Sequence, residues 1–360
     1  MFLTDMDPPD RDLLNLIQSR VPLVREPFAE LAGQLGWEEK EVLERLRHLR
    51  EQAGVIREIA GIFGAAALGY ALALAALRVG PPRLDQAGQI VAGHPGVSHC
   101  YAREGTYNLW FTLAVSPQSR LGLEGSVVAL ARKCGASSHL VLPTLRRYKL
   151  DVRFGAEDDE HANPPGTAPG TGVRPVAAAG APVPGPAKAP SPAPTQQQVR
   201  AIQALQIDLP IQSDPFAPLA RSADMDADDL LVHAADFLAV GWMRRYAATL
   251  HHRAAGAAAN VMVAWKAAPA YADAAGALCA QVSTVSHCYL RPAAPDWPYN
   301  LYTMIHGQSR EDCAMTIDRI ISTTGLSEHL ELWTKAEYRK QRVRLFSDQE
   351  AQWEEAHLRK

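Results

Sequence analysis

The pentapeptide Val-Ser-His-Cys-Tyr occurs twice in the chain, at Val97-Ser98-His99-Cys100-Tyr101 and at Val285-Ser286-His287-Cys288-Tyr289. Other matches keep the same order along the sequence: Pro27-Phe28 with Pro215-Phe216, Gly54-Val55-Ile56-Arg57 with Gly241-Trp242-Met243-Arg244, and Tyr107-Asn108-Leu109 with Tyr299-Asn300-Leu301. Self-similarity of this kind predicts an internal duplication. We therefore expect two homologous repeats on one chain.

The composition is typical of a soluble globular protein. The chain has 360 residues, of which 47% are hydrophobic and 21% charged, enough for two or more domains. Its formal net charge of −3 gives no general attraction for nucleic acid or for an anionic membrane. No apolar run reaches the ~20 residues that span a bilayer, and the first residues do not resemble a secretion signal. Five cysteines without a C-x-x-C pair favour a reduced, cytoplasmic protein without a structural zinc site.

A sharp change of composition separates the two repeats. Residues 156–194 consist mostly of Pro, Ala, Gly and Thr. Such a segment cannot bury enough apolar surface to become ordered. We therefore predict a first repeat over residues 1–155, a disordered linker over 156–194 and a second repeat over 195–360.

Each repeat divides into two parts. Apolar residues at helical spacing over 12–17, 27–35 and 38–46 predict a helix-turn-helix, and the stretch 54–63 alternates as a hairpin wing would. The rest of each repeat predicts the order β-α-β-β-α-β of a ferredoxin-like fold, with last strands over 148–154 and 339–346. We thus expect an α+β protein, with winged helices over about 10–63 and 197–250 and ferredoxin-like domains over about 64–155 and 251–346.

This layout resembles that of the leucine-responsive transcription regulators, so DNA binding has to be considered. A recognition helix needs exposed cations to neutralise phosphates. The second repeat instead has four aspartates within residues 224–229 at the matching position. The first repeat offers Arg45, Arg47 and Arg50, but glutamates accompany them. We expect no DNA binding, and winged helices that serve for packing.

The residues suited to chemistry are concentrated in the second repeat. His251-His252-Arg253 stand in the turn that leads to its first sheet strand. Alternate residues of a strand point the same way, so His287, Tyr289 and Arg291 are expected on one face. The following loop, residues 292–298, is longer than its counterpart in the first repeat and carries Trp297. A stiff loop with a large aromatic residue suits a lid over a flat ligand.

Four strings of residues in the second repeat resemble the siroheme decarboxylases. They are L-H-H-R-A-A-G, S-H-C-Y-L-R-P, D-W-P-Y-N-L-Y-T-M and E-Y-R-K-Q-R-V-R-L-F. The tandem arrangement is similar to the fused form found in the haem d1 pathway. The resemblance implies a carboxy-lyase that removes two acetate carboxylates from siroheme as CO₂, without an organic cofactor, in haem d1 or alternative haem biosynthesis and beside other enzymes of the haem d1 pathway. A tetrapyrrole-sensing regulator of the leucine-responsive class is the alternative.

The substrate implied by this resemblance decides which side chains are candidates. Siroheme carries eight carboxylates, so its site is expected to contain guanidinium and ammonium groups. A histidine with a pKa near neutral suits the proton transfers of decarboxylation, which makes His252 and His287 the catalytic candidates. No protein-built metal site is expected, although either histidine could coordinate the iron of siroheme. The candidates for substrate binding are His251, Arg253, Tyr289, Arg291, Trp297, Tyr299, Asn300, Lys340, Arg342 and Arg344.

The first repeat departs from this pattern. It has Gly64-Ala65-Ala66 where the second repeat has His251-His252-Arg253, and it lacks the Asp296-Trp297-Pro298 insertion. It retains His99, Tyr101 and Arg103. We predict a pseudo-dimer in which the second repeat is catalytic and the first is a structural partner. Whether the first repeat lends side chains to the site, and whether a larger homo-oligomer forms, stays open.

Overall fold

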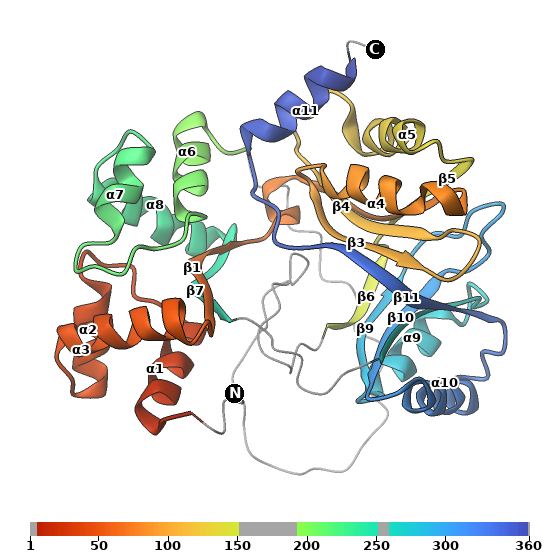
Figure 1. Ribbon diagram of the computed structural model, residues 1–360, viewed down its shortest axis with the longest axis horizontal. Helices are drawn as coiled ribbons and strands as arrows, with labels where there is room; N and C mark the ends of the chain where they lie inside the picture. The colour runs from red at the N-terminus through yellow and green to blue at the C-terminus, as the bar shows by residue number, and fades with distance from the viewer. Residues whose placement is uncertain (1–5, 151–192, 251–258, 359–360) are drawn as a thin grey trace.

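The computed structural model describes residues 6–150, 193–250 and 259–358. The expected linker lies outside these residues except for its last two positions, and so does the stretch His251-His252-Arg253. Figure 1 shows two bodies, with the helix-turn-helix units on one side and the larger sheet with its helices on the other.

Each repeat begins with a helix-turn-helix. The first contains α1 (Pro8–Ser19), α2 (Pro27–Leu35) and α3 (Glu39–Arg47), which continues as a π-helical segment, His48–Gln52. The second contains α6 (Gln196–Leu205), α7 (Phe216–Ser222) and α8 (Ala227–Val240). Local signals set these bounds: a Thr195–Gln198 capping box starts α6, and Gly241, in the left-handed region at φ 82°, ends α8.

The wing differs from the prediction. Strand β1 (Ile56–Phe63) does not fold back as a hairpin but pairs antiparallel with β7 (Met243–Leu250) of the other repeat. Most of β1 is buried, because both helix-turn-helix units pack on it and share one hydrophobic core. The hairpin prediction for residues 54–63 is therefore wrong, and the wing is one two-stranded sheet made by both repeats.

The remainder of each repeat has the predicted ferredoxin-like order. In the first repeat it consists of β2 (Ala71–Arg78), α4 (Leu84–Ala92), β3 (Val97–Arg103), β4 (Leu109–Val115), α5 (Gly122–Cys134), β5 (Ser138–Pro143) and β6 (Arg146–Leu150). In the second it consists of β8 (Ala259–Trp265), α9 (Ala272–Gln281), β9 (Val285–Leu290), β10 (Leu301–Gly307), α10 (Arg310–Thr324) and β11 (His329–Lys340). The α+β class and the two repeats are confirmed. Short 3-10 turns, Ala66–Leu68 and Pro81–Arg83, flank β2.

The strands of both repeats form one sheet in the order β5-β2-β4-β3-β11-β8-β10-β9-β6. The first residues of β11 pair with β8 of its own repeat, and the later ones pair with β3 of the other. In the same way β5 pairs with β2, while β6 pairs with β9 of the second repeat. Only Thr144 and Leu145 separate β5 from β6, which are the two ends of the strand order. The sheet thus closes on itself, and each repeat ends in a strand that crosses to the other.

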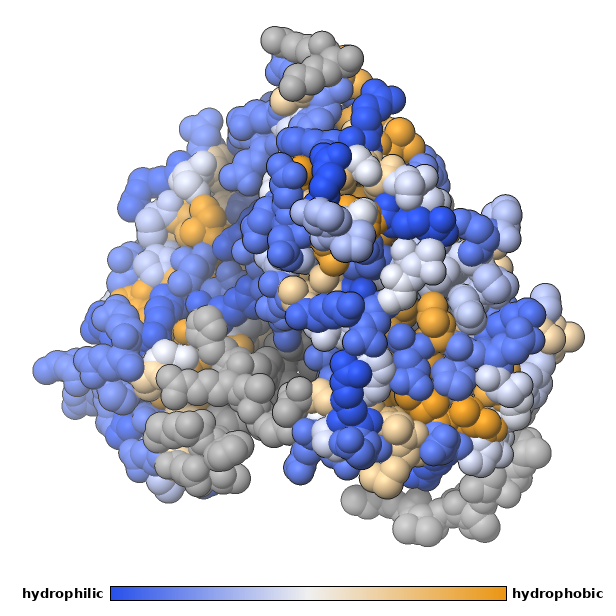
Figure 2. Space-filling model, turned by 45° about the vertical axis from the view of Figure 1, so that its right-hand side comes forward, coloured by the Kyte–Doolittle hydropathy of each residue, from blue (hydrophilic) through white to orange (hydrophobic). Residues whose placement is uncertain are grey.

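This sheet has an inner and an outer face. The inner face encloses a core that includes Trp110, Leu140, Trp297, Tyr302 and Leu332. The outer face is covered by α4 and α5 on the first repeat and by α9 and α10 on the second (Figure 1). Apolar residues appear only in small, separate areas on the face drawn in Figure 2. Over the described ranges, no helix has the length and apolar character needed to cross a membrane.

The C-terminal region also differs from the prediction. A last strand was expected over residues 339–346, but β11 ends at Lys340 and residues 341–347 leave the sheet. Helix α11 (Asp348–Leu358), which was not predicted, then lies on the first repeat (Figure 1). Its Glu350 accepts a hydrogen bond from the amide of Ser116 at 2.7 Å, and its Glu354 accepts one from the amide of Arg120 at 2.9 Å. The end of the second repeat is thereby fixed to the first.

Candidate functional site

Strand β9 brings His287 and Tyr289 to the inner face of the sheet. Cys288 between them is buried in the core on the helix side, as the alternation of a strand requires. Nδ1 of His287 lies 2.7 Å from the hydroxyl of Ser286, and the rings of His287 and Tyr289 are stacked with centroids 6.2 Å apart. Both rings are half-buried. The strand therefore presents an oriented imidazole beside an aromatic face.

The duplicated pentapeptide has nearly the same geometry in β3. Nδ1 of His99 lies 3.1 Å from the hydroxyl of Ser98, and the rings of His99 and Tyr101 are stacked at 6.3 Å. The two copies of the motif are thus alike in local structure. Any functional difference between them has to come from the residues around them.

Arg291 was predicted to bind substrate, but the structure gives its guanidinium other contacts. It is only 6% exposed and donates to the carbonyl of Leu142 at 2.6 Å and to the hydroxyl of Thr144 at 3.1 Å. Burial lowers its pKa to about 10. Its counterpart Arg103 donates in the same way to Leu332 and Thr334, both at 3.0 Å. Arg103 thus links the end of β3 to β11 of the second repeat, and Arg291 links the end of β9 to residues 142–144 of the first repeat.

The loop with Asp296 and Trp297 is not a lid over an open face. Trp297 is 3% exposed, packs against Trp110 and Tyr107, and donates from Nε1 to the hydroxyl of Tyr302 at 2.6 Å. Asp296 accepts a hydrogen bond from the hydroxyl of Tyr107 at 2.6 Å. The apolar ring is held in the core between the two repeats, which corrects the expectation of a lid.

Tyr299 and Asn300 follow this loop. Tyr299 is half-buried with its ring 4.9 Å from that of Trp297. The side-chain amide of Asn300 makes two hydrogen bonds of 2.9 Å to the backbone of Ala267, and Asn108 bonds in the same way to Val79. The asparagine of the recurring Tyr-Asn-Leu therefore fixes the end of a strand. Asn300 thus has a structural role that requires no ligand.

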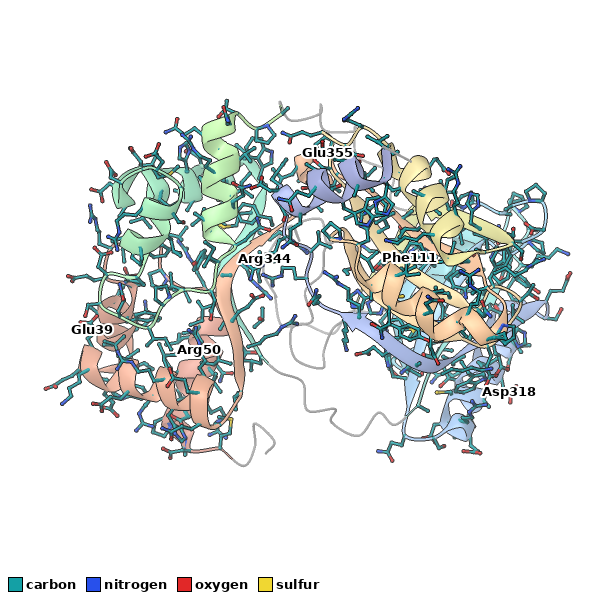
Figure 3. The ribbon with its side chains drawn as sticks, turned by 45° about the horizontal axis from the view of Figure 1, so that its top comes forward. Glu39, Arg50, Phe111, Asp318, Arg344 and Glu355 are labelled. Carbon is teal, nitrogen blue, oxygen red and sulfur yellow. The ribbon has the colours of Figure 1, made fainter. Side chains whose placement is uncertain are left out.

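The end of β11 brings Lys340 to His99 of the first repeat. Lys340 is the register partner of His99, and the amide of Gln341 donates to the carbonyl of Ser98. Arg342 and Arg344 form ion pairs with Glu58 of β1, at 3.5 Å and 3.2 Å. Figure 3 shows Arg344 beside the strand of the shared wing. Because β11 crosses to the first repeat, Lys340 borders His99. Substrate binding by Lys340, Arg342 and Arg344 stays a prediction.

The neighbour of the His287 strand is β6 of the first repeat. In its register Arg147 lies opposite Tyr289. Arg147 was not predicted as a site residue, since the pattern of a strand does not show which strand will be its neighbour. His251, His252 and Arg253 lie outside the described residues, although Leu250 directly before them ends β7. In the described ranges the candidate site thus consists of His287 and Tyr289 from one repeat and Arg147 from the other.

The arginines of the first helix-turn-helix are bound within the protein. Arg45 forms ion pairs with Asp10 at 2.8 Å and Glu41 at 3.0 Å, and Arg50 forms one with Asp208 at 3.0 Å. Arg47 donates to the carbonyl of Ile211. The guanidinium groups that would have to contact DNA phosphates are therefore engaged in contacts within the protein.

The acidic residues at the start of α8 also form contacts within the protein. Asp228 binds the guanidinium of Arg25 through two hydrogen bonds of 2.9 Å, and their mutual attraction raises the pKa of the guanidinium. The two helix-turn-helix units are joined by this pair. Their surfaces therefore serve the contact between repeats.

Comparison with known families agrees with this architecture. A model of the AsnC-like ligand binding domain matches residues 67–149 and 254–339, and a model of the siroheme decarboxylase NirDL-like HTH domain matches residues 10–57. The fold thus defines a fused protein with two domains of the AsnC-like class. The siroheme decarboxylase of Hydrogenobacter thermophilus is 32% identical over 341 residues, which cover 95% of this chain and 96% of that protein. The chain belongs to the siroheme decarboxylase family.

Two further relatives bear on its organisation. A crystal structure of the siroheme decarboxylase NirDL in complex with an iron-uroporphyrin III analogue superimposes with a TM-score of 0.75 at 29% identity, covering 97% of this chain and 99% of that one. The siroheme decarboxylase beta subunit of Desulfovibrio desulfuricans is 38% identical over 152 residues, 42% of this chain and 96% of that subunit. A separate subunit in that organism thus corresponds to about one repeat here.

Proposed function

We propose that this chain is a siroheme decarboxylase that removes the carboxylates of two acetate side chains, giving didecarboxysiroheme and two CO₂. The observation that carries the proposal is the relation to the Hydrogenobacter thermophilus siroheme decarboxylase over nearly the whole of both chains. The oriented His287 beside Tyr289 supports it, because the reaction needs a positioned proton donor next to a flat ring.

The proposed chemistry makes this chain a carboxy-lyase. A proton is added to the pyrrole carbon next to the one that bears the acetate, which leaves the acetate-bearing carbon electron-deficient. The bond from the acetate methylene to its carboxylate then breaks, CO₂ leaves, and the electron pair forms a double bond between the methylene and the ring carbon, which neutralises the ring. The exocyclic methylene is then protonated to a methyl group, and the ring carbon that was protonated first releases its proton. Each acetate thus exchanges one CO₂ for one proton. The proton itself is the electron sink, so no organic cofactor is needed, and iron enters only as part of siroheme.

The chain's own residues supply the proton and hold the substrate. His287 is the proposed donor in the described part of the site, and His252 is the second proposed donor. Tyr289, whose ring is flanked by the His287 ring and the Arg291 guanidinium, provides an aromatic contact for the macrocycle. The regulator alternative finds no support in the helix-turn-helix units, where Arg45, Arg47 and Arg50 are bound internally.

The deciding experiment incubates the purified protein with siroheme under anaerobic conditions and analyses the tetrapyrrole by mass spectrometry. A product lighter by two CO₂ supports the proposal. Siroheme recovered unchanged over a range of reducing conditions contradicts it. Unchanged siroheme together with a salt-dependent shift of DNA would favour the regulator.

A further inference from the structure

Arg147 lies on the inner face of the sheet, at the point where the first repeat borders the second. Its neighbours on β6 face the other way: Arg146 forms an ion pair with Asp273 of α9 at 2.9 Å, and the hydroxyl of Tyr148 donates to the same carboxylate. Successive side chains of a strand alternate, and directly opposed residues of paired strands share a face. Arg147 therefore shares the face of its register partner Tyr289.

The guanidinium of Arg147 differs from the cations around it. Lys149 donates to the carbonyl of Val282 at 2.9 Å, and Arg146 is paired with Asp273. Nη1 of Arg147, in contrast, is shielded from solvent and has no hydrogen-bond partner among the described residues. A buried donor in this condition is unfavourable unless an acceptor reaches it. This guanidinium is thus prepared for an acceptor that comes from outside the protein.

The duplicated motif provides an internal comparison. Tyr289 has Arg147 as its register partner, whereas Tyr101 has Glu337. The two copies of Val-Ser-His-Cys-Tyr have the same local geometry, so this position distinguishes them by charge. At this position the first copy has a carboxylate, which repels a polyanion, and the second has a guanidinium, which attracts one. The cation of the first copy, Lys340, is instead the register partner of His99.

We propose that Arg147 of the first repeat binds a carboxylate of the tetrapyrrole at the site formed by His287 and Tyr289 of the second. The inference rests on the proposed function and specifies one of its subsites. The planar fork of arginine matches a carboxylate, and a macrocycle in contact with Tyr289 brings its peripheral carboxylates to the adjacent strand. The site is then composite, and the first repeat is more than a structural partner.

The test compares Arg147→Gln with Arg146→Gln, a matched change one residue away on the opposite face. Siroheme affinity is measured by absorbance titration, and turnover is measured in the same preparations. We expect Arg147→Gln to weaken binding and raise KM by about tenfold or more, with a smaller effect on kcat, since a charge-assisted hydrogen bond to substrate is lost. Arg146→Gln leaves both within about twofold. Arg147→Lys, which keeps the charge but not the fork, restores part of the affinity.

Equal siroheme affinity of Arg147→Gln and Arg146→Gln overturns the inference. A wild-type protein that binds siroheme without decarboxylating it overturns the proposed function instead, and the difference in affinity between the two variants still decides the role of Arg147. Thermal unfolding of each variant shows whether it is folded. If Arg147→Gln is unfolded, the comparison of Arg147→Lys with Arg146→Lys replaces it, and equal affinities there also overturn the inference.

Discussion

Tyr338 of β11 lies against Gly88 of α4 so closely that a Cβ atom on Gly88 would stand 2.4 Å from Cε2 of the tyrosine ring. The hydroxyl of Tyr338 donates to Asp85, one turn earlier on α4, at 2.6 Å. Tyr148 of β6 has the same relation to Gly276 of α9, where a Cβ would stand 2.3 Å from the ring. Each repeat therefore anchors its last strand on a helix of the other, and each anchor depends on a glycine.

The first prediction concerns Gly276→Ala. Alanine normally favours a helix over glycine by about 1 kcal/mol. Here its methyl group overlaps the ring of Tyr148, and overpacking costs about 1–3 kcal/mol. We expect a net loss of unfolding free energy, measured by urea denaturation. Gly33→Ala in α2 is the control, because nothing lies within 4 Å of its Cβ position and the change is expected to stabilise. Equal effects at both sites would show that the Tyr148 ring moves aside.

The second prediction concerns Arg291→Met. Loss of the guanidinium leaves the carbonyl of Leu142 and the hydroxyl of Thr144 without their donor. We expect the unfolding free energy to fall by about 2–3 kcal/mol, with little change in the siroheme affinity of the folded protein. Arg132→Met, an exposed change on α5, is the control. A large loss of affinity at unchanged stability would instead return Arg291 to the substrate-binding residues.

The elements within each repeat could be predicted from local pattern. Helical spacing over residues 27–35 predicted the bounds of α2, and the duplicated pentapeptide located β3 and β9. The pairing between repeats could not be predicted, because an alternating pattern shows which face of a strand is buried but not which strand lies beside it. Hence the shared wing, the division between β5 and β6, and the crossing of β11 were all missed.

The candidate site shows the same limit. The motif identified His287 and Tyr289. Lys340 was grouped with them although it pairs with His99, and Arg147 was not predicted. One signal in the sequence agrees with the crossing of each last strand to the other repeat. Asp85 and Gly88 recur as Asp273 and Gly276, and each last strand carries a single tyrosine that fits the other repeat's glycine.

The third prediction is a pH dependence that arises from Glu350. Burial raises the pKa of its carboxyl from 4.5 to about 7. Between these values the unfolded chain releases a proton that the folded protein keeps, so the unfolding free energy falls as the pH rises through this range. Glu350→Gln removes the titration, and its amide oxygen can still accept from Ser116. Relative to wild type, we expect the variant to gain about 1–3 kcal/mol between pH 4.5 and pH 8.

Urea unfolding at both pH values checks this prediction, with Glu355→Gln as the control. Glu355 is on the same helix but exposed (Figure 3). If the two variants show the same pH dependence, the carboxyl of Glu350 does not hold a proton in the folded protein at neutral pH.

The last prediction compares the two histidines of the duplicated motif. His287 and His99 have the same hydroxyl on Nδ1 and the same stacked tyrosine, but only the strand of His287 borders Arg147. We expect His287→Ala to lower turnover of siroheme by ~10²–10⁴, the usual contribution of a positioned acid or base, and to leave binding largely intact. His99→Ala is expected to cost much less, because the first repeat has Gly64-Ala65-Ala66 where the second has His251-His252-Arg253. Turnover and siroheme absorbance spectra are measured for both variants. Equal losses with unchanged spectra would mean that both copies catalyse, whereas an altered spectrum for His287→Ala alone would make His287 a ligand of the substrate's iron.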